Sequence, residues 1–127
     1  MSFKVKFFED DFIYAIGAGI YGIYVQTNGR EELLYIGESV FVLVRCATHL
    51  YEIAKGNGYL GFTKERIENN NIVLVFKLLD SESAQKKRKE KEKEFIKIKH
   101  PKMQSGINDR VKSVENMINE LTNILNE

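Results

Sequence analysis

The sequence predicts an α/β protein of the α+β type. We expect a small central, mainly antiparallel three-stranded sheet flanked by helices, with an extra N-terminal strand and a C-terminal helix. Two short runs of β-forming residues, 19–26 and 33–37, flank the turn signal Thr27-Asn28-Gly29. A third run, 71–79, is the most β-prone of the chain. With 127 residues and 43% hydrophobic content, the chain is expected to form one domain, residues 1–127.

The first half of the chain predicts a strand, a hairpin and a helix. Residues 3–7 alternate apolar and basic side chains, which is typical of a half-exposed strand. The two runs around the turn signal form the hairpin. Ser39 is the expected N-cap of a helix from Val40 to about Lys55, and Gly56 ends that helix.

The second half predicts a loop, a central strand and two helices. Residues 59–70 form the loop, with one helical turn at 64–67, and 71–79 form the central strand. Asp80 or Ser81 caps a long helix that runs to about residue 99 and stops before Pro101. The inward side of this helix is expected to comprise Ala84, Phe95, Ile96 and Ile98.

A last helix is predicted over about 108–126, outside a core of about 12–104. Its apolar residues step by three and four and form a narrow stripe: Val111, Val114, Ile118, Leu121 and Leu125. The stripe either covers the core or meets a second copy of the chain, and we favour the first. The apolar helix near Phe41 is the other candidate surface for a homodimer.

Composition excludes several classes of protein. The net charge of +1 gives no overall attraction for nucleic acid. Cys46 is the single cysteine, which excludes an intrachain disulfide and a cysteine-based zinc site, and we expect a buried core thiol. No apolar run is long enough to span a membrane and the N-terminus lacks a signal-peptide pattern, so we expect a cytoplasmic protein with no membrane partner.

Two basic residues lie in the apolar helix after the hairpin. Arg45 and His49 are four residues apart and share one helix face. An arginine in such surroundings is costly unless an anion meets it, and its planar fork suits a phosphate. Pairing with a carboxylate explains Arg45 equally well, and a half-buried structural role is the simpler explanation for His49. Gly19 and Gly37 lie within strands, which indicates close approach by a backbone or a ligand.

The second long helix carries one acidic residue at the edge of its predicted inward side, Glu92. A lone carboxylate beside a phosphate is suited to hold Mg²⁺, although a surface salt bridge is the simpler explanation. Its lysines are ordinarily a solvated face and become candidates for phosphate contact only if the neighbouring site binds nucleic acid. These lysines are Lys86, Lys87, Lys89 and Lys93.

Taken together, these segments resemble the GIY-YIG endonuclease family. Gly19-Ile20-Tyr21 and Tyr35-Ile36-Gly37 correspond to the two strands that name the family. Arg45 stands eight residues after Gly37, and His49 four residues later. Glu92 is followed by Pro101 nine residues on, which is similar to the family's metal-binding helix and its closing proline. The resemblance covers residues 17 to about 104.

The resemblance implies a divalent-metal-dependent DNA endonuclease that hydrolyses phosphodiesters by a one-metal mechanism. Glu92 would hold Mg²⁺ or Mn²⁺, and Arg45 would neutralise charge on the phosphoryl oxygens. Tyr21 would help to deprotonate the attacking water, while Tyr35 and His49 would position water or relay protons. Free tyrosine has a pKa of about 10, so we expect Arg45 and the metal to lower the pKa of Tyr21.

The chain also departs from the family pattern. Gly-Ile-Tyr occurs twice, so Tyr24 is an alternative catalytic residue; Tyr21 and Tyr24 should face opposite sides of the sheet, and we favour Tyr21. The helix before Arg45 is apolar where the family carries basic residues, and Gln104 replaces the usual asparagine. The rival to a nuclease is therefore a catalytically inactive nucleic-acid-binding or assembly module on the same fold, or a structural domain.

Overall fold

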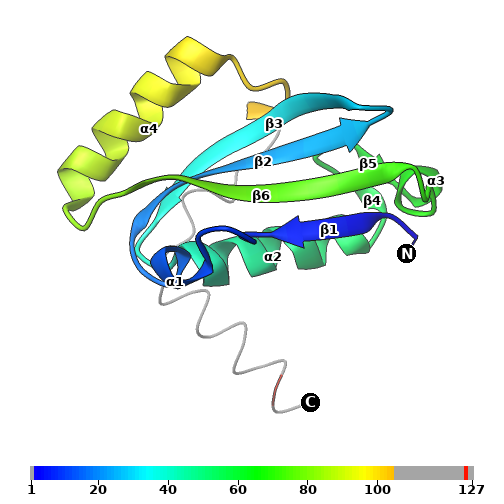
Figure 1. The fold of residues 1–127 in the computed structure, drawn as a ribbon, viewed down its shortest axis with the longest axis horizontal. Helices are drawn as coiled ribbons and strands as arrows, with labels where there is room; N and C mark the ends of the chain where they lie inside the picture. The colour runs from blue at the N-terminus through cyan, green and yellow to red at the C-terminus, as the bar shows by residue number, and fades with distance from the viewer. Residues whose placement is uncertain (1, 105–124, 126–127) are drawn as a thin grey trace.

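A computed structural model describes residues 2–104 and 125 of the chain (Figure 1). The elements follow in the order β1 (Lys4–Phe7), α1 (Phe12–Ala15), β2 (Gly19–Thr27), β3 (Arg30–Ser39), α2 (Val42–Ala54), β4 (Asn57–Tyr59), β5 (Phe62–Thr63), α3 (Lys64–Ile67), β6 (Ile72–Ser81) and α4 (Gln85–Lys99). The prediction of a mixed α/β protein with a mainly antiparallel sheet is confirmed. The predicted C-terminal helix over 108–126 falls outside the described residues, apart from Leu125.

The main sheet has the strand order β1-β6-β2-β3. The predicted hairpin is β2–β3, and Asn28 and Gly29 at its turn both have positive φ, as a tight two-residue turn requires. β2 also pairs antiparallel with β6, so both are inner strands. The extra N-terminal strand, β1, pairs parallel with β6 at the opposite edge from β3.

The two long helices pack on opposite faces of this sheet. Tyr21 of β2 lies opposite Gly37 of β3, and its hydroxyl is hydrogen-bonded to His49 of α2. The next residue of β3, Glu38, points to the other face and binds Arg88 of α4. The sheet therefore lies between α2 and α4, as the ribbon shows (Figure 1).

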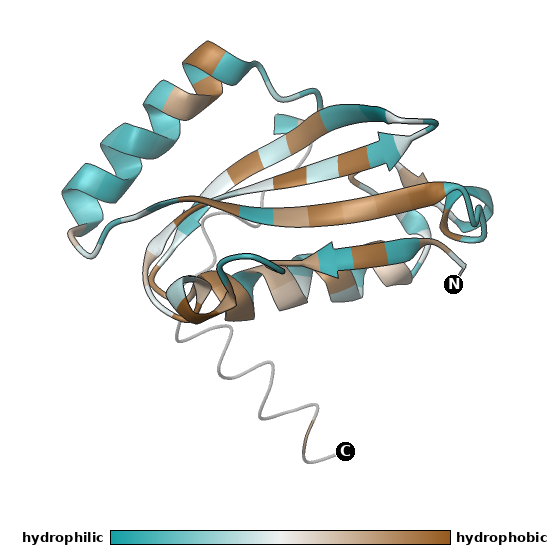
Figure 2. Cartoon of the chain, viewed as in Figure 1, coloured by the Kyte–Doolittle hydropathy of each residue, from teal (hydrophilic) through white to brown (hydrophobic). Residues whose placement is uncertain are grey.

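Hydropathy follows this layering. The central strands and α2 are rich in apolar residues, whereas α4 is hydrophilic except near its C-terminal end (Figure 2). The main hydrophobic core lies between the Tyr21 face of the sheet and α2, with the side chains of Ile23, Cys46 and Leu74 at its centre. None of the helices in the described part of the chain is long and apolar enough to span a membrane.

Helix starts differ from the prediction. Strand β3 continues through Ser39 because Ser39 still pairs with Gly19, so α2 begins at Val42 and Ser39 is not its N-cap. The Ser39 hydroxyl instead accepts a hydrogen bond from the backbone N–H of Phe41. Likewise β6 extends to Ser81, and α4 begins only at Gln85 without a side-chain cap. The predicted helix ends hold, at Gly56 and before Pro101.

The predicted loop over 59–70 contains more structure than expected. The helical turn at 64–67 is confirmed as α3, and the Thr63 hydroxyl accepts a hydrogen bond from the Arg66 N–H at its start. A short hairpin, β4–β5, precedes it and was not predicted from the sequence. Its turn residues, Leu60 and Gly61, both have positive φ. Strand signals in segments this short are too weak to separate from loop.

Candidate active site

The centre of the candidate site is a hydrogen bond between β2 and α2. The Tyr21 hydroxyl lies 2.8 Å from Nε2 of His49, and both side chains are buried. Tyr21 points into the core because it lies two residues before Ile23 on β2, and the two side chains therefore share one face of the strand. The strand and the helix thus bring together two predicted site residues that are 28 positions apart in the chain.

Tyr35 of β3 completes the aromatic part of the site. Its ring centroid lies 5.3 Å from that of His49 and 6.4 Å from that of Tyr21, and its side chain is fully buried. Gly37, two residues on, shares this face, and a Cβ there would meet the hydroxyl and ring of Tyr21. The predicted close approach at Gly37 is therefore that of an aromatic ring. At Gly19 it is the backbone carbonyl of Asp80.

Arg45 lies one helical turn before His49 on the buried side of α2. It is 2% exposed. Its positive charge favours the ionised forms of Tyr21 and of the neighbouring Cys46, and so opposes the rise in their pKa values that burial causes. Cys46 is fully buried as expected, and burial raises the pKa of its thiol well above the ordinary value despite Arg45. The four predicted residues Tyr21, Tyr35, Arg45 and His49 therefore share one face of the sheet.

Arg45 by itself does not bring the expected lowering of the Tyr21 pKa. Burial is the largest influence and raises this pKa well above its usual value, and Cys46 and Tyr35 raise it further. Arg45 acts in the expected direction but is the weaker influence. Desolvation wins because the phenolate would have to exist in a water-free interior. Tyr21 is therefore a neutral phenol at physiological pH.

A third tyrosine joins the site from the unpredicted hairpin. The Tyr59 hydroxyl lies 2.7 Å from Nδ1 of His49, so both ring nitrogens of the histidine are hydrogen-bonded to tyrosine hydroxyls. Tyr59 is half-buried, whereas Tyr21 is 1% exposed. Sequence reasoning missed Tyr59 because it lies in a segment predicted as loop. The glycines that flank it, Gly58 and Gly61, were the available signal of a tight turn.

Tyr24 faces away from this site, as the strand alternation predicted. Its half-buried ring lies under the Lys77 ammonium, with 4.6 Å between the nitrogen and the ring centroid. The same ring covers Gly22, whose added Cβ would come within 2.8 Å of it. Of the two Gly-Ile-Tyr copies, only Tyr21 makes the contact with His49.

Glu92 stands on α4, across the sheet from Tyr21 and Arg45. It is half-buried and follows Arg88 by one turn, on the same side of the helix. Among the residues that the structure describes, no group of three or more His, Cys, Asp or Glu side chains could hold a metal ion. One carboxylate is still compatible with Mg²⁺, which keeps several waters and takes oxygens from substrate phosphates. Glu92 fits that requirement as a donor.

The inward side of α4 is only in part the one predicted. Phe95 and Ile96 are half-buried as expected, but Ala84 and Ile98 are exposed, and the buried residue is Arg88, at 3% exposure. Arg88 donates to Glu38 at 2.8 Å and to the backbone carbonyls of Ser83 and Glu82. A buried ion pair thus takes the place of the expected apolar contact. The predicted nucleic-acid-binding lysines are all exposed on this helix: Lys86, Lys87, Lys89 and Lys93.

Gln104 seals the outer edge of β3. Its side-chain amide donates to the Ile36 carbonyl and accepts from the Ile36 N–H, both at 2.8 Å. The two preceding residues continue this pairing, because the backbone N–H groups of Lys102 and Met103 donate to the backbone carbonyls of Leu33 and Leu34. The segment after α4 therefore covers the strand that carries Tyr35, and the glutamine has a structural role there.

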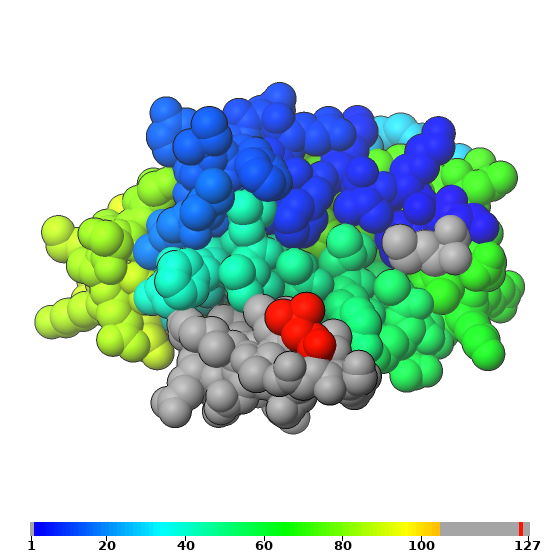
Figure 3. Space-filling model, turned by 90° about the horizontal axis from the view of Figure 1, so that it is seen from below, coloured from blue at the N-terminus to red at the C-terminus, as the bar shows by residue number. Residues whose placement is uncertain are grey.

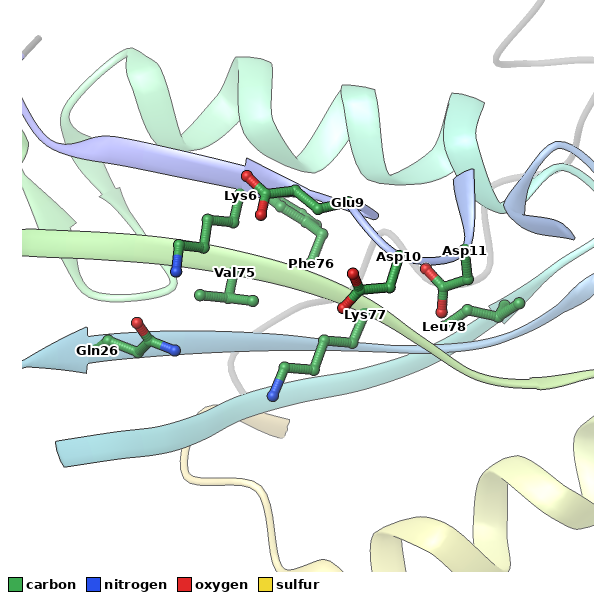
Figure 4. Close-up of a pocket in the computed structure, with 9 residues that line it drawn as sticks. All are labelled: Lys6, Glu9, Asp10, Asp11, Gln26, Val75, Phe76, Lys77 and Leu78. Carbon is green, nitrogen blue, oxygen red and sulfur yellow. The ribbon is translucent and has the colours of Figure 1, made fainter. Parts of the chain in front are cut away.

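A cleft of about 270 Å³ opens on the sheet face away from Tyr21 (Figure 4). Lys6 and Lys77 project from β1 and β6, and Glu9, Asp10 and Asp11 form the opposite wall. Lys6 pairs with Val75 of β6, and Val75 in turn pairs with Tyr24 of β2. The cleft therefore lies on the Tyr24 face of the sheet. The cleft and the tyrosine–histidine cluster are therefore separate features.

Exposed apolar residues gather where α1 meets the start of α2, two segments that lie side by side in the space-filling view (Figure 3). The Val42 N–H donates to the Gly17 carbonyl and ties the two segments together. The patch includes the predicted dimer candidate Phe41, 44% exposed. The other exposed apolar residues there are Phe12, Ile13, Tyr14, Ile16 and Val40. Dimerisation through this surface stays a prediction.

Comparison of the chain with protein-family models, with curated proteins and with solved structures yielded no match.

Proposed function

We propose that this protein is a DNA endonuclease of the GIY-YIG type that hydrolyses phosphodiester bonds and depends on Mg²⁺ or Mn²⁺. The observation that carries the proposal is the 2.8 Å hydrogen bond between Tyr21 and His49, with Arg45 one turn away on the same helix. A hydroxyl bonded to an imidazole beside a cation is an arrangement suited to proton transfer and to stabilising a developing negative charge.

The residues on the Tyr21 face have distinct roles in this proposal. Tyr21 is a neutral phenol, so it gives its proton to His49 as it takes one from the attacking water. Arg45 offsets the negative charge that develops on the phosphoryl oxygens and on the phenol oxygen. Tyr35 packs against the imidazole of His49 and holds its plane.

Glu92 would hold the divalent ion, but α4 lies on the opposite face of the sheet from Tyr21 and Arg45, so a phosphate that meets all three residues requires a rearrangement of this structure. When bound, such an ion polarises a scissile phosphate and stabilises the leaving oxygen. The exposed lysines of α4 extend the positive charge of the same helix, which supports contact with a nucleic-acid backbone: Lys86, Lys87, Lys89 and Lys93.

The second candidate is a nucleic-acid-binding or assembly module that does not cleave. The burial of the cluster favours it, because Tyr21, Tyr35, Arg45 and His49 are each at most 2% exposed. A catalytic group must touch its substrate, so the nuclease requires an opening of this surface. A purely structural cluster requires none.

Plasmid nicking distinguishes the two candidates. The full-length chain is incubated with supercoiled plasmid and Mg²⁺, with and without EDTA. The wild type should convert supercoiled to nicked plasmid, and Tyr21→Phe, Arg45→Ala and Glu92→Ala should each slow this by roughly 100-fold or more. Tyr24→Phe and Glu94→Ala are the matched controls, on the same strand and the same helix, and should cut normally.

Two results would reject the nuclease. One is plasmid that stays intact, and the other is nicking that persists equally in all three site variants. Mobility-shift binding of plasmid fragments that survives the three substitutions, without nicking, would identify the binding module. Loss of both binding and cleavage in every variant, with folding intact, supports one shared site.

A further inference from the structure

The imidazole of His49 is held between two hydroxyl groups. Tyr21 meets its Nε2 at 2.8 Å and Tyr59 meets its Nδ1 at 2.7 Å. A neutral imidazole carries one N–H donor and one lone pair, and a hydroxyl can serve either. The hydrogen-bond chain therefore has two directions, and only one leaves Nε2 able to accept the proton of Tyr21.

The β4–β5 hairpin places Tyr59 beside His49. Tyr59 and Phe62 pair across a two-residue turn in which Leu60 and Gly61 have φ of 52° and 81°. Positive φ at the first turn position is unfavourable for leucine and is ordinarily taken by Asn, Asp or Gly. Leu60 is nevertheless 3% exposed within the core, so its burial offsets that conformational cost. The buried side chain of Leu60 thus anchors the hairpin in the core, directly after Tyr59.

We propose that Tyr59 is a positioning residue of this site. Its hydroxyl accepts the Nδ1–H of His49 and thereby holds the tautomer whose Nε2 lone pair faces the Tyr21 hydroxyl. The inference deepens the proposed nuclease function and rests on it for its catalytic meaning. In the proton transfer, the Oη–H bond of Tyr21 breaks and an Nε2–H bond forms, while the Tyr21 oxygen takes a proton from the attacking water, which leaves a neutral phenol beside an imidazolium. The Nδ1 proton stays on the imidazole, hydrogen-bonded to the Tyr59 hydroxyl, as an orienting group holds a catalytic histidine in the serine protease triad.

The ring geometry supports this assignment. The His49 and Tyr59 rings are separated by 5.9 Å between centroids and inclined by 33°. Tyr35 and Tyr21 bracket the other sides of the imidazole, at 5.3 and 5.6 Å between centroids. Since three aromatic rings surround His49, the imidazole is held in place, and the choice of tautomer falls to the hydroxyls.

Nitrogen NMR of the histidine side chains tests the proposal without any activity assay. The chain has only two histidines, His49 and His100, so a His100→Gln variant assigns the signals. In the ¹⁵N-labelled full-length protein at neutral pH, His49 should carry its proton on Nδ1. Tyr59→Phe should bring the two nitrogen shifts of His49 toward each other or exchange them. Tyr51→Phe, which alters an exposed tyrosine of α2, should change neither shift.

A wild-type His49 protonated on Nε2 would overturn the proposal, and so would nitrogen shifts that Tyr59→Phe leaves unchanged. If the wild type nicks plasmid, Tyr59→Phe should lower kcat by about tenfold or more with little change in KM. Unchanged kcat in this variant would reject the positioning role. A protein with the expected nitrogen shifts but no nicking rejects the proposed function and leaves the tautomer assignment supported.

Discussion

The ring of Tyr21 lies across Gly37, its cross-strand partner, and the Tyr21 hydroxyl reaches His49 over that glycine. A side chain at position 37 would occupy the space of the phenol, so the glycine and the tyrosine form one unit of the sheet. Such covering of a strand glycine by an aromatic ring also protects the backbone where no side chain packs.

Gly37→Ala should therefore disrupt the site as well as the fold. The added methyl would meet the hydroxyl and ring of Tyr21, which is fully buried and has no room to turn aside. We expect a loss of roughly 2 kcal/mol or more in the free energy of unfolding, as for overpacked cores. Urea denaturation measures this loss, and the nitrogen shifts of His49 report the altered contact with Tyr21.

Gly22→Ala is the matched control for this experiment. It adds the same methyl to the neighbouring strand, where the added atom meets the half-buried ring of Tyr24. That ring can move toward solvent, so the substitution should cost clearly less than Gly37→Ala and leave His49 unaffected. Equal losses from the two substitutions would contradict the linked roles of Gly37 and Tyr21.

Stability should fall at alkaline pH because of Tyr21. Its pKa is raised in the folded state by burial, so the unfolded chain loses this proton first, at about pH 10. The associated stability is fully present below that pH and is lost as the pH rises toward the folded pKa. Cys46, whose pKa is raised for the same reason, adds to the loss from about pH 8.5 upward.

Thermal melts between pH 8 and 12 measure this effect. Tyr21→Phe should reduce the alkaline decline in the melting temperature, because a phenylalanine has no proton to lose. Tyr14→Phe, at an exposed tyrosine of α1, should leave the decline as it is in the wild type. Identical slopes for the wild type and Tyr21→Phe would show that Tyr21 does not titrate on unfolding.

Most of the sheet could be predicted from the sequence. The β2–β3 hairpin is predicted by the β-forming residues on both sides of Asn28-Gly29. Strand β6 is predicted by its run of branched apolar residues, and the structure keeps both of these local preferences. The start of α4 was not predictable in this way. Strand β6 extends to Ser81 because Ser81 pairs with Gly19 of β2. This partner lies 62 positions earlier in the chain, so no local pattern reveals the pairing.

The site was predictable only in part. Tyr21 and His49 could be joined because strand alternation and helix periodicity fix which side each one faces. Tyr59 could not, since a three-residue strand has no periodicity to detect. The Tyr21 pKa was misjudged because a sequence shows neighbouring charge but not depth, and burial outweighs Arg45 here.

Arg88 fixes α4 to the sheet, and its removal should destabilise the protein. Its guanidinium is 3% exposed and pairs at 2.8 Å with Glu38, which is 16% exposed. Arg88→Met should therefore lower the free energy of unfolding by about 3 kcal/mol, because the carboxylate of Glu38 would be left half-buried without its partner. Lys91→Met is the matched control: its pairs with Asp80 and Glu82 lie at the surface, where solvent screens them, and should contribute much less than the Arg88 pair. In urea denaturation, adding Glu38→Gln to Arg88→Met should recover part of the loss, and equal effects of Arg88→Met and Lys91→Met would contradict the anchoring role.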